Sequence, residues 1–176
     1  MIIHIFGAAG SGTSTLGKAY ALKHGYKFID VDDYYWLPTD IPFTKAREKE
    51  LRVKLLKEEL EKGGDFVVSG AVCKWGDDLI PYFDIVVKLE TPTDIRIARL
   101  RKREKERFKN RIEVGGDMYY NHIRFIDWAK VYDDGDLSVR SNKLHNHWLN
   151  KISVKKLVLD GSKEIEELIN EIDKTF

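Results

Sequence analysis

A glycine-rich segment near the start of the chain constrains the fold more than any other feature. It runs from Gly7 to Thr15, directly after the apolar run Ile2–Phe6 and directly before a helical pattern over Ser14–His24. Phosphate oxygens need several donors and little steric obstruction, and glycines let the backbone turn tightly and point its N–H groups inward. The positive end of the following helix adds to the attraction. The segment therefore predicts a strand–loop–helix unit that holds nucleotide phosphates.

One position departs from the G-x-x-x-x-G-K-[ST] pattern, because Thr13 stands where lysine is expected. We expect another cation to take its place, with Lys74 and Arg140 as candidates. A tight turn without a ligand is the alternative interpretation. The residues predicted to bind the nucleotide are Gly7, Ala9, Gly10, Ser11, Gly12, Thr13, Ser14 and Thr15.

Short apolar runs alternate with helical patterns along the chain, which is typical of a parallel sheet with right-handed crossovers. The expected strands are Ile2–Phe6, Lys27–Val31, Phe66–Ser69, Asp84–Leu89 and Val154–Leu159. The expected helices are Ser14–His24, Thr44–Lys62, one that begins at Thr91-Pro92, Asp117–Tyr132, Ser141–Asn150 and Lys163–Thr175, with Thr91 and Ser162 as caps. We expect one α/β domain over residues 1–176, with a five-stranded parallel sheet flanked by helices in three layers.

Composition narrows the classes of partner. The chain has 30 Lys and Arg against 29 Asp and Glu, and this net charge of +1 argues against a dedicated nucleic-acid binder. No apolar run is long enough to span a membrane, and the first residues lack the basic region of a signal peptide. With Cys73 as the single cysteine, we expect a cytoplasmic protein without membrane contact. We expect a monomer or homodimer that acts on a small-molecule acceptor.

These motifs resemble the nucleoside monophosphate kinase-like P-loop proteins, the relatives of adenylate and cytidylate kinases. The segment Gly7–Thr15 is similar to their G-x-x-G-S-G-K-x-T loop, and threonine at the lysine position is similar to the G-S-G-T-T-T loop of archaeal cytidylate kinases. The run Arg99-Leu100-Arg101-Lys102-Arg103 resembles their R-x-x-x-R. The resemblance implies ATP as donor, Mg²⁺ as cofactor, Arg99 on the adenine base and Arg103 on the phosphates. It also implies a short lid at about 104–117, and Asp160-Gly161-Ser162 near adenine.

Four arginines recur at helical spacing around this motif, at Arg96, Arg99, Arg103 and Arg107. Three- and four-residue steps place them on one helix face, where guanidinium groups repel one another unless anions bind. We therefore expect Arg103 and Arg107 to be catalytic. The alternative is a solvated face balanced by neighbouring glutamates.

A cluster of aspartates, Asp30, Asp32 and Asp33, closes the second expected strand. Ligands of parallel sheets bind outside the carboxyl ends of the strands, so these carboxylates should point toward the phosphates. We expect Asp32 to be catalytic and, with Ser14, to hold Mg²⁺, with Asp30 as the other candidate for the metal; a capping turn is the alternative. The predicted acceptor-binding residues are Asp33, Tyr35, Trp36, Arg47, Gly70 and Lys74. We expect His145 and His147 at the surface and assign them no function.

The expected activity is ATP-dependent phosphoryl transfer to a small acceptor, in the first place a nucleoside monophosphate. Arg47, Arg52 and Lys74 favour a phosphate-bearing acceptor, whereas Asp32 and Asp33 favour the alternative, a hydroxyl acceptor such as a nucleoside or a shikimate-like metabolite. A nucleotide-binding protein without turnover is a third possibility. A dehydrogenase is disfavoured, because the loop reads G-x-x-G-x-G and the chain has no Tyr-x-x-x-Lys pair.

Overall fold

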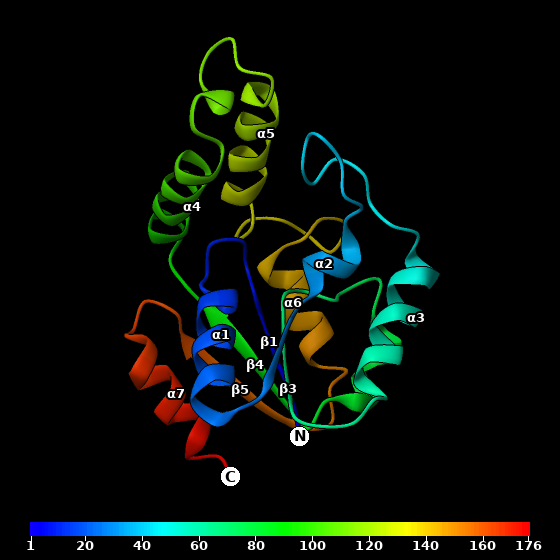
Figure 1. Ribbon diagram of the computed structural model, residues 1–176. Coiled ribbons are helices and arrows are strands. Elements are labelled where there is room, and N and C mark those ends of the chain that lie inside the picture. Colours follow the sequence, from blue (N-terminus) through cyan, green and yellow to red (C-terminus); the bar gives the residue numbers. More distant parts are fainter.

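Five short strands pair in parallel into one sheet in the order β2-β3-β1-β4-β5 (Figure 1). A computed structural model describes residues 1–176. The strands are β1 (Ile2–Gly7), β2 (Lys27–Asp30), β3 (Phe66–Ser69), β4 (Ile85–Glu90) and β5 (Lys155–Asp160). All five strands predicted from the sequence are present, within one or two residues of the expected bounds.

Helices cover both faces of the sheet, which confirms the three-layer α/β fold. On one face, α1 (Thr13–His24) and α7 (Ile165–Asp173) bury residues such as Leu16 against the strands. On the other face, α3 (Lys49–Leu60), the short helix η1 (Asp77–Tyr82) and α6 (Asn142–Leu149) bury residues such as Trp148. Because both faces are covered, the three central strands β3, β1 and β4 are apolar at most positions, whereas the edge strands β2 and β5 also carry exposed polar residues.

The central strand is β1, which lies between β3 and β4. Ile3 is in register with Val67 on one side and with Ile85 on the other. The glycine-rich loop that follows β1 therefore leaves the sheet at its carboxyl edge, beside the ends of both neighbouring strands. This is the edge where open parallel sheets bind ligands.

A helical hairpin rises above this edge (Figure 1). It consists of α4 (Thr93–Phe108), the short helix η2 (Lys109–Ile112) and α5 (Tyr119–Lys130), and we call it the lid hairpin. Residues 104–117, which the sequence predicts as a lid, form its outer end. No helix combines the length and the apolar character needed to cross a membrane.

The segment after β2 differs from the sequence-based expectation. The chain turns at Asp30 into the short helix α2 (Val31–Tyr35), and α3 starts at Lys49 rather than at Thr44. Between them, residues 36–46 fold back on themselves, with a bridge from Trp36 to Ala46. We call residues 36–46 the arm.

Two of the capping predictions are wrong. The Thr91 hydroxyl donates to the carbonyl of Ser11 at 3.1 Å instead of capping α4. The Ser162 hydroxyl donates to Asp160, and α7 begins only at Ile165. Both side chains instead make hydrogen bonds in the loops that border the glycine-rich segment.

The surface placement of His145 is also wrong. Its side chain is fully buried, and its Nδ1 lies 2.8 Å from the Tyr132 hydroxyl. Burial lowers the pKa of His145 to about 3, so the ring is neutral in the core. His145 sits in α6, and Ser141 Oγ caps this helix by accepting from the amide of Leu144 at 3.0 Å.

Candidate nucleotide and acceptor site

The glycine-rich loop adopts a backbone that only glycine accommodates easily. Gly10 has φ 82° and Gly12 has φ 102°, both in the left-handed region. A Cβ at Gly10 would lie 2.6 Å from the Arg96 carbonyl oxygen, and one at Gly7 would lie 2.7 Å from the Leu89 carbonyl oxygen. The loop is therefore packed tightly against β4 and α4.

Most of the backbone donors of this loop are available to a ligand. The amide of Ser11 donates to Ala8, but those of Gly10, Gly12, Thr13 and the two residues that follow donate to no group of the protein. The amides from Thr13 onward form the first turn of α1, which carries no acidic residue. Free N–H groups at the positive end of a helix are what phosphate oxygens require. The predicted residues from Gly7 to Thr15 thus form one loop whose free backbone donors suit an anion.

Arg99 and the Asp160–Ser162 turn meet on one side of the loop, as the family resemblance implies. Arg99 Nη1 donates to the Gly161 carbonyl at 3.0 Å and to the Ser11 carbonyl at 3.3 Å. A Cβ on Gly12 would lie 3.6 Å from the same nitrogen. The exposed guanidinium therefore stands beside the phosphate loop, where the base of a nucleotide can reach it.

Arg96 does not belong to the anion-binding face that the spacing predicts. Its side chain is fully buried and donates to carbonyl oxygens of Thr91 (3.0 Å) and Ala129 (3.1 Å) and to the Asp133 carboxylate (3.1 Å). The prediction fails at Arg96, because α5 packs over this part of α4 and covers it. Arg96 instead joins the two ends of the lid hairpin at its base.

Ser14 of the loop is hydrogen-bonded to Asp30. Ser14 Oγ donates to Asp30 Oδ2 at 3.1 Å, while Asp30 Oδ1 accepts from the amide of Asp32 at 3.1 Å and caps α2. Hydroxyl and carboxylate oxygens suit Mg²⁺, and the pair stands directly beside the free amides of the loop, so these residues fit such an ion. No cluster of three His, Cys, Asp or Glu is present, so phosphate oxygens and water would complete the coordination. The sequence offered Asp32 or Asp30 for this role and preferred Asp32, whereas Asp30 is the one that contacts Ser14.

Asp32, in the first turn of α2, faces cations from two other parts of the chain. The surrounding protein raises the pKa of its carboxyl, and the charge of Asp30 raises it further, whereas Arg140 and Arg103 lower it. The carboxylate is thus in the electrostatic range of both arginines. Arg140 makes no hydrogen bond or ion pair within the protein and lies over the Trp128 ring at 5.5 Å. It is the better placed of the two candidates for the missing lysine.

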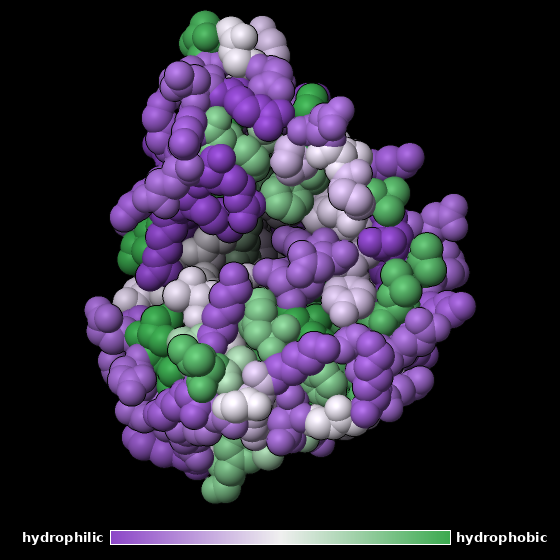
Figure 2. Space-filling view, in the orientation of Figure 1, coloured by the Kyte–Doolittle hydropathy of each residue, from purple (hydrophilic) through white to green (hydrophobic).

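The cleft between α2, the arm and the lid hairpin is visible at the surface. Figure 2 shows the surface hollowed beneath the hairpin, with hydrophilic residues around the hollow. Arg103 is half exposed and lies 3.7 Å from Glu104, while the Arg107 guanidinium lies 5.4 Å from the centre of the Phe43 ring on the arm. Arg103 and Arg107 therefore extend from α4 toward the cleft beneath the lid hairpin.

Several predicted acceptor residues are engaged within the protein. Arg47 Nε donates to the Tyr34 carbonyl at 2.9 Å, Lys74 Nζ donates to the Ser138 carbonyl, and Arg52 lies 3.8 Å from the centre of the Tyr35 ring. Gly70 has φ 112°, and a Cβ there would lie 2.3 Å from Val31. Trp36, which follows the end of α2, is half-buried, and Asp33 of α2 is exposed.

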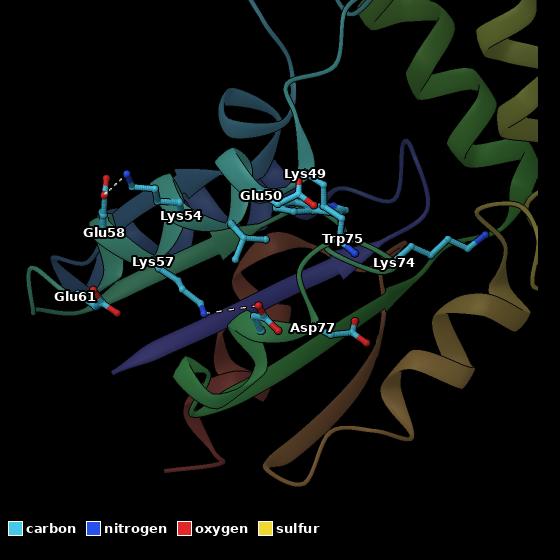
Figure 3. A pocket seen from close by; sticks show the side chains of 11 residues that line it. Lys49, Glu50, Lys54, Lys57, Glu58, Glu61, Lys74, Trp75 and Asp77 are labelled. Atoms are coloured by element: carbon cyan, nitrogen blue, oxygen red, sulfur yellow. Dashed lines mark ion pairs between the residues drawn. The ribbon is translucent and has the colours of Figure 1, made fainter.

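Another surface groove lies away from the phosphate loop. It has a volume of about 590 Å³ and runs between α3 and the segment around Trp75, with no residue of the phosphate loop in its wall (Figure 3). Lys57 pairs with Asp78 there at 3.8 Å, and Lys74 extends away from α3. Its mixed, mutually paired charges give it no preference for a phosphate.

Comparisons with known proteins agree with this geometry. The family described as "AAA domain" matches residues 3–121. The uncharacterized protein YqaC of Bacillus subtilis is 43% identical over 97% of this chain and 94% of its own length. The cytidylate kinase of Methanocorpusculum labreanum is 27% identical over 73% of this chain and 82% of its own length.

Solved structures share the fold across almost the whole chain. The shikimate kinase of Bacteroides thetaiotaomicron has a TM-score of 0.62 at 20% identity, covering 99% of this chain and 97% of its own. The deoxyadenosine kinase of M. mycoides has a TM-score of 0.51 at 16% identity, covering 99% and 98%. At these identities the likeness concerns the fold alone.

Proposed function

Because the chain belongs to the AAA-domain family of P-loop proteins and resembles nucleoside monophosphate kinases, we propose that it transfers the γ-phosphoryl group of ATP to a small acceptor. Relatives named as cytidylate kinases and the kinase fold support phosphoryl transfer. For the acceptor, we propose a hydroxyl group. One observation carries this choice: Asp30 takes the hydrogen bond of Ser14, so the Asp32 carboxylate is not committed to Ser14 and lies beside Trp36, within range of Arg103 and Arg140.

In this proposal each element has one task. The amides from Gly10 to Thr15 bind the phosphates, and Arg99 with Gly161 holds the base. Mg²⁺, when bound beside Ser14 and Asp30, neutralises charge on the phosphates. Asp32 accepts the proton of the acceptor hydroxyl, and Arg103 and Arg107 stabilise the charge that spreads over the transferred group.

A nucleoside monophosphate is the second candidate, because the relatives named as cytidylate kinases act on such acceptors by name. The basic side chains that favoured a monophosphate acceptor already have partners within the protein. Arg47 and Lys74 donate to carbonyl oxygens, and Arg52 stacks on Tyr35. Arg140 is the free cation that could bind a phosphate-bearing acceptor instead.

An acceptor screen tests the proposal. Purified protein with ATP and Mg²⁺ would be incubated with nucleoside monophosphates, nucleosides and small hydroxy acids, and ADP release and phosphorylated product measured together. We expect product from a hydroxyl compound. Product from a monophosphate alone would favour the second candidate, and ADP release without any phosphorylated acceptor would contradict both.

Arg103→Ala should lower kcat/KM by about 100-fold or more, because it removes a cation that stabilises transition-state charge. The melting temperature should barely change, since the side chain is 48% exposed and its nearest partner, Glu104, lies 3.7 Å away. Arg101→Ala is the matched control, because Arg101 is exposed on a different face of α4. An Arg103→Ala protein that is less stable but catalytically normal would contradict this role.

A further inference from the structure

The tip of the arm packs into the outer end of the lid hairpin. Phe108, Ile112 and Met118 form an apolar cluster there, separate from the cores on the sheet, and each is less than a tenth exposed. Ile41 is the apolar side chain from outside the hairpin that packs against them. The arm and the lid hairpin therefore meet above the cleft, although 67 residues of sequence separate Ile41 from Phe108.

Polar contacts flank this apolar cluster. Arg111 Nη2 donates to the Asp40 carbonyl at 3.2 Å, and Asp117 holds the same guanidinium with a contact of 2.7 Å. Arg107 lies over Phe43 at 5.4 Å. Residues on both sides of Ile41 thus contact the hairpin, which fixes the direction from which its side chain enters.

Contacts within the arm tip fix the position of Ile41. The hydroxyls of Thr39 and Thr44 both donate to the Ile41 carbonyl, at 2.6 and 2.7 Å. Phe43 has φ 61°, a conformation that is costly for an aromatic residue and persists only where surrounding contacts maintain it. At the base of the arm, the Leu37 amide donates to the Lys45 carbonyl at 2.9 Å. These contacts make the tip a defined turn and not a loose loop.

We propose that Ile41 is a positioning residue for the reaction: by anchoring the arm in the lid hairpin, it forms the roof of the acceptor site. The roof holds Arg107 of α4 against Phe43 of the arm at the edge of the acceptor site, and it admits only acceptors small enough to lie beneath the arm. This inference rests on the proposed function. The nucleotide contacts at Gly12, Arg99 and Gly161 lie at the base of the hairpin, outside the influence of Ile41.

Ile41→Asp tests the anchor, with Val114→Asp as the matched control. Val114 lies at the same end of the lid hairpin, but its side chain is 85% exposed and outside the cluster. In hydrogen exchange without ligand, Ile41→Asp should speed exchange at residues 108–118 by about 10-fold or more, since an aspartate cannot replace the apolar contacts of the partly buried isoleucine. Val114→Asp and Ile41→Val should exchange like wild type. Unchanged exchange in Ile41→Asp would overturn the proposal.

Kinetics separate a positioning role from a purely structural one. With MgATP and the acceptor found in the screen, Ile41→Asp should raise the acceptor KM by about 10-fold or more and change the ATP KM by less than about 2-fold. Ile41→Val should restore the wild-type acceptor KM. An Ile41→Asp enzyme with a wild-type acceptor KM would overturn the positioning role and leave the proposed function standing. Failure of the wild type to phosphorylate any acceptor would instead contradict the proposed function.

Discussion

Replacing Gly12 with valine should reduce the affinity for MgATP by about 100-fold or more, because several phosphate donors are displaced at once. Gly12 has φ 102°, a conformation in which a β-branched residue is strained. The first added carbon would lie 3.6 Å from Arg99 Nη1, so the two methyl groups beyond it would fill the space between the loop and this arginine. Strain would also turn the amides of Gly12 and Thr13 away from the phosphates.

Isothermal titration with ATP and Mg²⁺ measures this loss, and Gly25→Val provides the control. Gly25 ends the same helix α1 with φ 73° and has nothing within 4 Å of its ideal Cβ. It therefore suffers the same kind of backbone strain far from the loop, and should lose stability while ATP affinity stays near wild type. Equal ATP affinity in Gly12→Val and wild type would show that the phosphates bind elsewhere.

The strands and the phosphate loop could be predicted because their signals are local. A strand covered on both faces must be apolar at nearly every position, as Phe66–Ser69 is, and no distant contact is needed to recognise it. The glycines at 10 and 12 likewise report a backbone conformation that few other residues adopt. The wrong helix start at Thr44 has the opposite cause: the chain there is held by the Trp36 bridge and by the lid hairpin, which no local pattern reveals.

The sequence alone could not distinguish the residues of the site from neighbours of the same type, because residues of one type have the same chemistry. Arg96 and Arg103 occur in the same periodic pattern, yet only the packing of α5 buries the first and leaves the second at the cleft. Asp30 and Asp32 differ by two positions. Which of them contacts Ser14 depends on the turn of the chain into α2 immediately after Asp30, and a strand continuing to Val31 would have given a different partner.

This difference between the two aspartates leads to the second large effect. Asp32→Asn keeps the shape of the side chain and removes its charge, so a proton acceptor for a hydroxyl substrate is lost. We expect kcat to fall by about 10²–10⁴-fold while ATP affinity stays nearly intact. Raising the Mg²⁺ concentration should not rescue this loss, because Ser14 donates to Asp30 and not to Asp32.

Asp30→Asn is the matched comparison, since it makes the same chemical change two residues away, at the residue that contacts Ser14. Its loss should be recovered in part by higher Mg²⁺. If Mg²⁺ instead rescues Asp32→Asn, then Asp32 serves the ion and a monophosphate acceptor becomes the better proposal. Wild-type activity in Asp32→Asn would show that these aspartates only stabilise the turn and take no part in the reaction.

The pH dependence of kcat tests independently whether the Asp32 carboxylate accepts the proton. Desolvation by the neighbouring protein and the charge of Asp30 raise the pKa of Asp32, and Arg140 and Arg103 offset only part of that rise. A proton acceptor must be ionised, so activity is present above this raised pKa and is lost as the pH falls through it. The acid limb of the wild-type profile should therefore lie above the ordinary range of aspartate. The limb should disappear in Asp32→Asn and persist in Asp30→Asn, because only the first variant removes the titrating group that accepts the proton.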